Sequence, residues 1–312
     1  MIIVRITSGL GNQMYQYAFY RLMQELYGVD QVRADVTWFY ANNDHHGYEL
    51  ERIFGNVAGS EFEIKKATAA QIFHATGLIP NLCRGRLGKA FEKFRRYPNR
   101  ILRECTGKSR IGNIIDYVDQ KTTGADLFHL PQEHDWYLKG FFIEEPYYRD
   151  RLEQLRRELV FPPFAADENE ALASKMRLTN SVSIHVRRGD YLTTYESMFV
   201  ALGREYYEKA VAYIEDHVEN PVYYIFSDDS DFVKEQFDWL PNKTIVTHNT
   251  GENSFRDMQL MSICKHNIIA NSTFSQWGSL LNENKEHLTI YPAAYLKGEE
   301  SELKTIENWV RI

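Results

Sequence analysis

The chain has 312 residues, of which 44% are apolar and 14% aromatic, enough for roughly two domains with ordinary hydrophobic cores. Its net charge of −7 argues against a protein that binds nucleic acid through its overall charge. The three cysteines lack the spacing of a disulfide framework or a zinc site. No segment approaches the ~20 apolar residues of a membrane span, and the N-terminus lacks a signal-peptide pattern. We therefore expect a cytoplasmic protein.

The N-terminal segment predicts a strand, a turn and a helix. Apolar residues alternate over 2–6, a glycine-bearing turn follows at 8–13, and residues 14–26 have helical spacing. This order, with Gly9 and Gly11 in the turn, is typical of the opening of a Rossmann-like unit, whose helix N-terminus can bind an anion. A tight turn without a ligand explains the same glycines, because the complete Gly-x-Gly-x-x-Gly pattern is absent.

Two further segments of the first half have an unusual composition. Residues 38–55 combine aromatic rings with short amides and histidines, which suits a loop that stacks on sugar rings and equally suits a plain surface loop. Residues 60–110 are predicted to be helical, and 84–110 are rich in Lys and Arg although the whole chain is acidic. This basic segment either contacts anionic lipid or an anionic acceptor, or it is a solvated helical face.

A strand over 136–142 and a helix over 146–159 end the first half. Pro162 and Pro163 cannot continue a helix, so we place the domain boundary there, with domains at 1–163 and 164–312. The alternation that follows predicts an α/β fold with a parallel sheet covered on both faces. Its helices are expected at 167–178, 203–218, 232–240, 253–264 and from 273, and its strands at 182–186, 222–227, 244–247, 266–270 and, last, 288–291.

In this second half, polar residues follow three of the predicted strands, at the sheet edge where open α/β folds bind ligands. One strand ends in Arg187 and Arg188, whose planar guanidinium groups match phosphate oxygens, and another leads into a helix N-terminus, which favours phosphate. We interpret this edge as a nucleotide-diphosphate site, without the Walker lysine that phosphoryl transfer from ATP would use. The residues expected to converge there are His185, Arg187, Arg188, Asp190, Ser227, Asp228, Asp229, Asn271, Ser272, Thr273 and Ser275.

The acidic residues of this half leave two alternatives open. Asp257, on the predicted helix 253–264, is suited to accept the N1–H and N2–H donors of guanine, or it is a helix-capping or surface residue. The acids from Asp228 to Asp231 suit a divalent ion, which prefers carboxylates, or they cap the helix that follows. Two arginines are already present to neutralise a diphosphate, so we favour the cap and expect no metal.

Four motifs together resemble the bacterial α-1,2-fucosyltransferases of glycosyltransferase family 11. The motifs are Ser8–Met14, His185–Tyr191, Phe226–Asp229 and His266–Ser275, and the resemblance spans nearly the whole chain. It implies a GT-B fold, with two Rossmann-like domains facing across a cleft. It also implies a metal-independent, inverting transfer of L-fucose from GDP-fucose to the 2-hydroxyl of a terminal galactoside.

The partners that the resemblance implies are GDP-fucose and a galactose-terminated oligosaccharide or glycolipid, with no cofactor and no nucleic acid. A glycolipid acceptor would suit a peripheral contact of residues 84–110 with the inner membrane. One position departs from the family pattern: many members carry two tryptophans after Ser275, whereas this chain has Gln276 and Trp277. The departure concerns local packing or the acceptor side rather than the donor site.

The resemblance also implies roles for single residues. Arg187 would donate to the β-phosphate, and His185 and Asp257 would contact GDP. Asp190 is a candidate general base, with Glu196 as an alternative, unless Asp190 only orients the arginines. The other residues expected at the donor are Gly11, Asn12, Arg188, Ser227, Asp228, Asn271, Thr273, Phe274 and Ser275.

Two other functions compete with this one. A metal-dependent transferase of another nucleotide sugar would use the acids Asp228 to Asp231, and full activity in excess EDTA would exclude it. A sugar- or nucleotide-binding module would need no chemistry, and transfer from any donor would exclude it. Three polar strand ends and a helix N-terminus are more than simple sugar binding requires.

Overall fold

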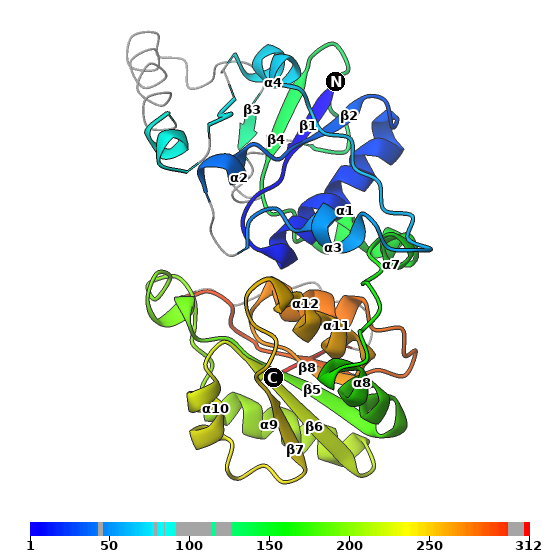
Figure 1. Ribbon diagram of the computed structural model, residues 1–312, viewed down its shortest axis with the longest axis vertical. Coiled ribbons are helices and arrows are strands. Elements are labelled where there is room, and N and C mark those ends of the chain that lie inside the picture. Colours follow the sequence, from blue (N-terminus) through cyan, green and yellow to red (C-terminus); the bar gives the residue numbers. More distant parts are fainter. Residues whose placement is uncertain (43–45, 78–79, 84, 92–113, 117–125, 299–308) are drawn as a thin grey trace. The chain divides into compact units, whose positions relative to one another are not determined.

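The computed structural model describes residues 1–42, 46–77, 80–83, 85–91, 114–116, 126–298 and 309–312 (Figure 1). The chain divides into two compact units, Met1–Val160 and Phe161–Ile312, three residues before the predicted boundary. Within the described residues, no helix has both the length and the apolar character needed to cross a bilayer. The predicted basic segment lies outside the described residues from position 92 onward, so its contact with a membrane stays a prediction.

Unit 1 is built on a parallel sheet with the strand order β2-β1-β4-β3. The alternation at the N-terminus forms β1 as predicted, and β4 lies within the predicted strand 136–142. Helix α4 packs on the sheet through Ile72 and Ala75, which contact Ile3 and Tyr137. The strands are β1 (Ile2–Arg5), β2 (Val32–Asp35), β3 (Ile114–Asp116) and β4 (Trp136–Lys139), and the helices include α1 (Leu10–Tyr27), α2 (Trp38–Ala41), α3 (Leu50–Phe54), α4 (Ala69–Thr76) and α7 (Leu152–Glu158). Residues 85–91 are also helical.

Helix α1 begins at Leu10, four residues earlier than predicted, so Gly11 and Asn12 lie in its first turn and not in a loop. Two buried glutamine side chains of the helix form hydrogen bonds with the neighbouring segments. Gln13 donates to the carbonyls of Ser8 and Gly47, each at 2.8 Å, and Gln16 accepts from the backbone N–H of Thr7 at 2.8 Å. Met14, which is fully buried, stands where a complete glycine motif would have its third glycine.

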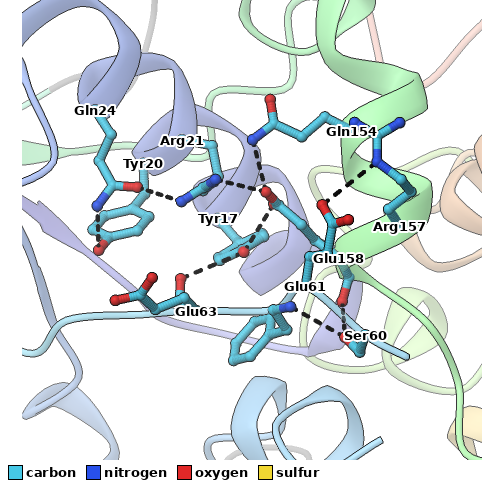
Figure 2. A network of polar contacts seen from close by, with 11 residues as sticks. Tyr17, Tyr20, Arg21, Gln24, Ser60, Glu61, Glu63, Gln154, Arg157 and Glu158 are labelled. Carbon is cyan, nitrogen blue, oxygen red and sulfur yellow. Dashed lines mark hydrogen bonds and ion pairs between the residues drawn. The ribbon is translucent and has the colours of Figure 1, made fainter. Parts of the chain in front are cut away.

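Figure 2 shows a polar network that joins α1 to the end of α7. Glu158, only 1% exposed, accepts from the Tyr17 hydroxyl at 2.9 Å and pairs with Arg21 at 2.7 Å. Burial and the nearby Glu158 carboxylate raise the pKa of Tyr17, so the phenol keeps its proton and remains a donor. Ser60 donates to the backbone carbonyl of Glu158 at 2.7 Å. The network therefore fixes the last turn of unit 1.

Unit 2 carries a six-stranded parallel sheet with the order β10-β9-β8-β5-β6-β7. Its strands are β5 (Asn180–Val186), β6 (Pro221–Ser227), β7 (Lys243–Val246), β8 (His266–Ile268), β9 (Thr289–Tyr291) and β10 (Trp309–Arg311). Its helices are α8 (Glu168–Leu178), α9 (Arg204–His217), α10 (Ser230–Gln236), α11 (Phe255–Ile263) and α12 (Thr273–Leu280). The short η3 turn (Asp190–Leu192) follows β5.

Alternate residues of these strands belong to two different cores, as the period of two requires. On β6, Ile225 packs in a cluster with α9, whereas its neighbours Tyr224 and Phe226 pack in a cluster with α8 and α11. Figure 1 shows these helices around the strands. The α/β class with two Rossmann-like units, as in the GT-B type, is therefore confirmed.

Several predicted boundaries differ from the structure. Residues 61–65 are not helical, and Lys66 forms a bridge with Ala34. The predicted loop 38–55 contains α2 and α3, and the predicted helix 146–159 consists of two 3₁₀ turns, η1 (Glu145–Tyr147) and η2 (Arg149–Arg151), before α7. The strand at 288–291 is not the last one, since β10 pairs beside it. The predictions did not include β2, β3 or β10.

Candidate functional site

Arg187 directly follows β5 and lies between two carboxylates. Its Nη2 is 2.8 Å from Asp190 Oδ2 and its Nη1 is 3.0 Å from Asp228 Oδ2, so each end of the guanidinium holds one acid. Burial opposes the charge, but Asp228 and Asp190 outweigh it and raise the pKa of Arg187. Because a guanidinium has five N–H donors, this fixed group keeps donors for a phosphate.

Asp228 fixes the turn that follows β5. Its Oδ1 accepts from the backbone N–H of Arg188 at 2.9 Å, and its Oδ2 accepts from that of Gly189 at 3.2 Å. A Cβ on residue 189 would lie 3.0 Å from Asp228 Oδ2, so glycine permits this close approach. Asp228 itself follows β6, where Ser227 Oγ accepts from the backbone N–H of Asp229 at 2.9 Å. The ends of neighbouring strands are thus tied together.

Arg188 is held against α10. Its guanidinium carbon lies 3.5 Å from the centre of the Phe232 ring, and its Nε lies 3.3 Å from Asp229 Oδ2. A cation over a ring face is attracted by the ring quadrupole, so the two contacts together fix the side chain. Arg187 and Arg188, adjacent in sequence, therefore have different surroundings.

The acids after β6 do not gather at one point. Asp229 Oδ1 accepts from the Phe232 backbone N–H at 3.0 Å, which confirms the predicted cap of α10. Asp231 is exposed and pairs with Lys234 at 3.1 Å. Within the part of the chain that the structure describes, no group of three or more His, Cys, Asp or Glu residues is arranged to hold a metal ion.

His185 is the second-to-last residue of β5, and its side chain is only 5% exposed. Burial, with a smaller contribution from the Arg187 charge, lowers the pKa of His185 to about 3, so the ring is neutral at physiological pH. Its ring centre lies 5.8 Å from that of Phe274. Its buried Nδ1 has no hydrogen-bond partner among the described residues, which leaves one ring nitrogen for a ligand.

The N-terminus of α12 follows β8, which is the other neighbour of β5 in the sheet. Ser272 caps the helix by accepting from the Phe274 backbone N–H at 3.4 Å, and Tyr191 donates to the Asn271 carbonyl at 2.7 Å. Asn271 donates its amide to the carbonyls of Val200 and Tyr295, so it orders the loops around this end.

The two residues at the start of α12 differ in exposure. Ser275 is buried and donates to the Ser272 carbonyl at 3.2 Å, whereas Thr273 is half-buried. The hydroxyl of Ser275 is therefore engaged within the helix end, and only the backbone N–H groups of this turn and the Thr273 side chain are suited to meet a phosphate.

Asp257 lies in the first turn of α11 and belongs to a separate polar network. Its Oδ1 accepts from the Asn249 amide at 2.8 Å, and Asn249 exchanges two hydrogen bonds of 2.9 Å with Asn169. Burial raises the pKa of Asp257 to about 7, although the bond from Asn249 lowers it in part. A desolvated carboxylate gains strongly from a pair of N–H donors.

The structure brings together the predicted residues that follow β5, β6 and β8, because these three strands are neighbours in one sheet. The contacts of Arg187 with Asp228, His185 with Phe274 and Tyr191 with Asn271 join the three ends. Four other predicted residues lie elsewhere: Gly11 and Asn12 are in unit 1, Asp257 is in the separate network on α11, and Glu196 is exposed in the segment after η3.

Sequence reasoning missed the amides that hold Asp257. Asn249 follows β7 at the same carboxyl edge of the sheet as the other polar strand ends, and that position was the available signal. Asn169 gave no such signal, because it lies on α8 and reaches Asn249 only through the fold.

The family model "Glycosyl transferase family 11" matches residues 111–312. Two relatives from Escherichia coli align along nearly the whole length of both chains: the O-antigen biosynthesis glycosyltransferase WbnK is 28% identical, over 98% of this chain and 99% of its own, and an alpha-1,2-colitosyltransferase is 29% identical, over 100% and 99%. The human galactoside alpha-(1,2)-fucosyltransferase 1 is 25% identical over 62% of this chain and 60% of its own.

Proposed function

Because the chain belongs to glycosyl transferase family 11, we propose that it transfers L-fucose from GDP-L-fucose to the 2-hydroxyl of a terminal galactoside, with inversion and without a metal ion. The names of the relatives support an α-1,2 transfer of a deoxy sugar. The observation that carries the proposal is the guanidinium of Arg187, held by Asp190 and Asp228 at the carboxyl end of β5.

In the proposed reaction, the galactoside 2-hydroxyl oxygen forms a bond to the fucose anomeric carbon while the bond from that carbon to the β-phosphate oxygen breaks. Negative charge grows on the departing GDP. Arg187 and the backbone N–H groups at the start of α12 stabilise that charge, in the role that a metal ion has in other glycosyltransferases. The donors are fixed before the reaction, so little reorganisation is needed.

The nucleotide specificity is assigned to Asp257 and His185. Guanine presents two adjacent N–H donors, which suit the Asp257 carboxylate that Asn249 already orients. Uracil and adenine lack that pair of donors. The neutral His185 ring lies near the carboxyl end of β5, and its Nδ1 has no hydrogen-bond partner among the described residues. This nitrogen is suited to a further polar contact with GDP.

The acceptor hydroxyl must also lose a proton. Asp190 is the candidate base: its Oδ2 is engaged by Arg187 at 2.8 Å, whereas its buried Oδ1 has no hydrogen-bond partner among the described residues. We assign Asp190 to positioning Arg187, because a proton taken up by the carboxylate would remove the charge that holds the guanidinium. The proton then leaves to a group outside this cluster or to solvent.

A second candidate donor is the corresponding colitosyl nucleotide, because the E. coli alpha-1,2-colitosyltransferase aligns over the whole chain. Colitose is L-fucose without the 3-hydroxyl. An enzyme built to hydrogen-bond that hydroxyl rejects the deoxy sugar strongly, whereas one without such a partner accepts both. For the acceptor, we propose a galactose-terminated oligosaccharide or a lipid-linked O-antigen intermediate, in line with the name of WbnK.

The test is a transfer assay with lactose as acceptor and either GDP-fucose or GDP-colitose as donor, with and without excess EDTA. We expect an α-1,2-linked product, identified by NMR, at a rate that EDTA does not change. Transfer only from the colitosyl donor would select the second candidate. Product with neither donor, or activity lost in EDTA, would contradict the proposal.

A further inference from the structure

A chain of polar side chains in unit 2 ends at Asp257. His248 and Asn249 follow β7, and Asn169 lies in the first turn of α8. The His248 ring is 2.8 Å from Asn169 Oδ1 through its Nε2, and 3.5 Å from Glu168 Oε1 through its Nδ1. Helices α8 and α11 share one apolar cluster, which holds the two ends of the chain in place. A partly exposed histidine is thus connected to the carboxylate that the proposed function assigns to guanine.

The middle of this chain is a pair of buried amides. Asn169 donates its Nδ2 to Asn249 Oδ1, and Asn249 donates its Nδ2 to Asn169 Oδ1, each at 2.9 Å. Each amide has one accepting end and one donating end, so turning both amides over would retain this reciprocal pair of bonds. The pair alone therefore permits two arrangements, and the groups at its two ends decide between them.

The two arrangements differ in the atom that faces Asp257. In the observed one, Asn249 Nδ2 donates to Asp257 Oδ1 at 2.8 Å. In the other, the Asn249 carbonyl oxygen would face the carboxylate. An N–H stabilises an ionised carboxylate, whereas a carbonyl oxygen repels it and favours the protonated acid. Guanine, which offers N–H donors, needs the first arrangement.

The imidazole at the other end selects the same arrangement. A carbonyl oxygen only accepts, so the contact of His248 Nε2 with Asn169 Oδ1 requires a proton on Nε2. Turning the amides over would bring the Asn169 N–H groups against this ring N–H. The carboxylate of Glu168 beside Nδ1 is 69% exposed, so it interacts weakly with the ring.

From this geometry we infer that His248 is a positioning residue for guanine recognition, an inference that rests on the proposed function. Acting through Asn169 and Asn249, it keeps an amide N–H, and not a carbonyl oxygen, facing the carboxylate of Asp257. His248 does not touch the nucleotide in this assignment. Its contribution is the bias that one hydrogen bond between neutral groups gives to an equilibrium, which is about fivefold.

The test compares His248→Phe with His248→Gln by calorimetric titration with GDP between pH 6 and pH 8.5. Phenylalanine removes the ring N–H, whereas the glutamine amide can place an N–H at about the same position and carries no charge. We expect His248→Phe to bind GDP about fivefold more weakly at pH 6 and within about twofold of the wild type at pH 8.5. The physical reason is that Asp257, whose pKa is raised to about 7, then ionises about 0.7 pH unit higher.

The conservative variant and a matched control separate the N–H from other effects. His248→Gln should stay within about twofold of the wild type at every pH. The control is His217→Phe, because His217 is exposed on α9 and bonds the Tyr213 carbonyl of its own helix. It should leave GDP affinity and its pH dependence unchanged.

Two further measurements test the path through the amides. Asn169→Leu removes the middle of the chain, so it should raise the pH midpoint of GDP binding at least as much as His248→Phe, and combining the two should give no further shift. Nitrogen-15 NMR of the GDP complex of the wild type at pH 8 should find the ring proton of His248 on Nε2. This measurement needs no variant.

Several results would overturn the inference: an unshifted midpoint in a folded His248→Phe, additive shifts in the double variant, or a neutral His248 ring with its proton on Nδ1. A GDP affinity lowered equally at every pH would also overturn it, because a merely structural role has that effect. A wild type that does not bind GDP, or that prefers UDP or ADP, would instead refute the proposed function.

Discussion

Replacing Arg187 by Lys keeps the positive charge and removes the planar fork. In the structure, one end of that fork contacts Asp190 at 2.8 Å and the other contacts Asp228 at 3.0 Å. A single ammonium nitrogen cannot hold both carboxylates in this way and still face a phosphate. The substitution therefore separates the charge of Arg187 from its geometry.

The expected size of the effect follows from these contacts. The lysine loses at least one charge-assisted hydrogen bond, which is worth about 1.5–3 kcal/mol. A preorganised donor that stabilises charge in the transition state is worth about 2.7–4 kcal/mol, or roughly 10²–10³ in kcat. We expect Arg187→Lys to lower kcat about 100-fold and Arg187→Ala about 1,000-fold, with a smaller change in donor KM.

The assay is steady-state transfer from GDP-fucose to lactose, with Arg188→Lys as the matched control. Arg188 is adjacent in sequence but packs on Phe232 and Asp229, so its substitution should change kcat by less than about fivefold. Thermal unfolding of each variant confirms that it is folded. A kcat within about threefold of the wild type for Arg187→Lys, or an equal loss in both variants, would refute the reasoning.

Three further predictions concern single residues. Gly189→Ala places a Cβ 3.0 Å from Asp228 Oδ2, so we expect kcat about tenfold lower with an unchanged unfolding midpoint; normal kcat would contradict the close approach. Burial raises the pKa of Asp257 to about 7 and guanine needs the ionised carboxylate, so calorimetry should find GDP affinity constant above pH 7 and falling about tenfold per pH unit below it, while Asp257→Asn binds weakly with no such dependence. Glu158→Gln leaves Arg21 without its buried partner, and urea unfolding should find it destabilised by about 3 kcal/mol; a loss under about 1 kcal/mol would count against the network.

The second unit was predictable because its signals are local. The alternation over β5 and the helical spacing of α8, α9 and α11 each lie within one segment, and each matched the structure to within a few residues. The polar strand ends were also predictable, because parallel strands bring their carboxyl ends to one edge. The separate environments of Arg187 and Arg188 were not, since they depend on which side of the turn Asp228 and Phe232 occupy.

The missed elements depend on partners far away in the chain. Strands β2 and β10 are short, and each is stabilised by pairing with β1 or β9 rather than by its own pattern. Strand β1 ends at Arg5, and Ser8, whose φ of 67° turns the chain, comes just before Gly9, so α1 begins directly after this turn. Likewise, the bond from Tyr137 to Asp35 joins residues of two different strands, which no local pattern contains.

The most direct measurement is calorimetric titration of the wild-type protein with GDP, UDP and ADP, each with and without excess EDTA. The account predicts tight binding of GDP, at least about tenfold weaker binding of UDP and ADP, and no change with EDTA, since Arg187 holds the diphosphate and Asp257 the guanine. A preference for UDP or ADP would contradict the role of Asp257. Loss of GDP binding in EDTA would contradict an arginine-based site. It would indicate instead that the acids after β6 bind a metal ion.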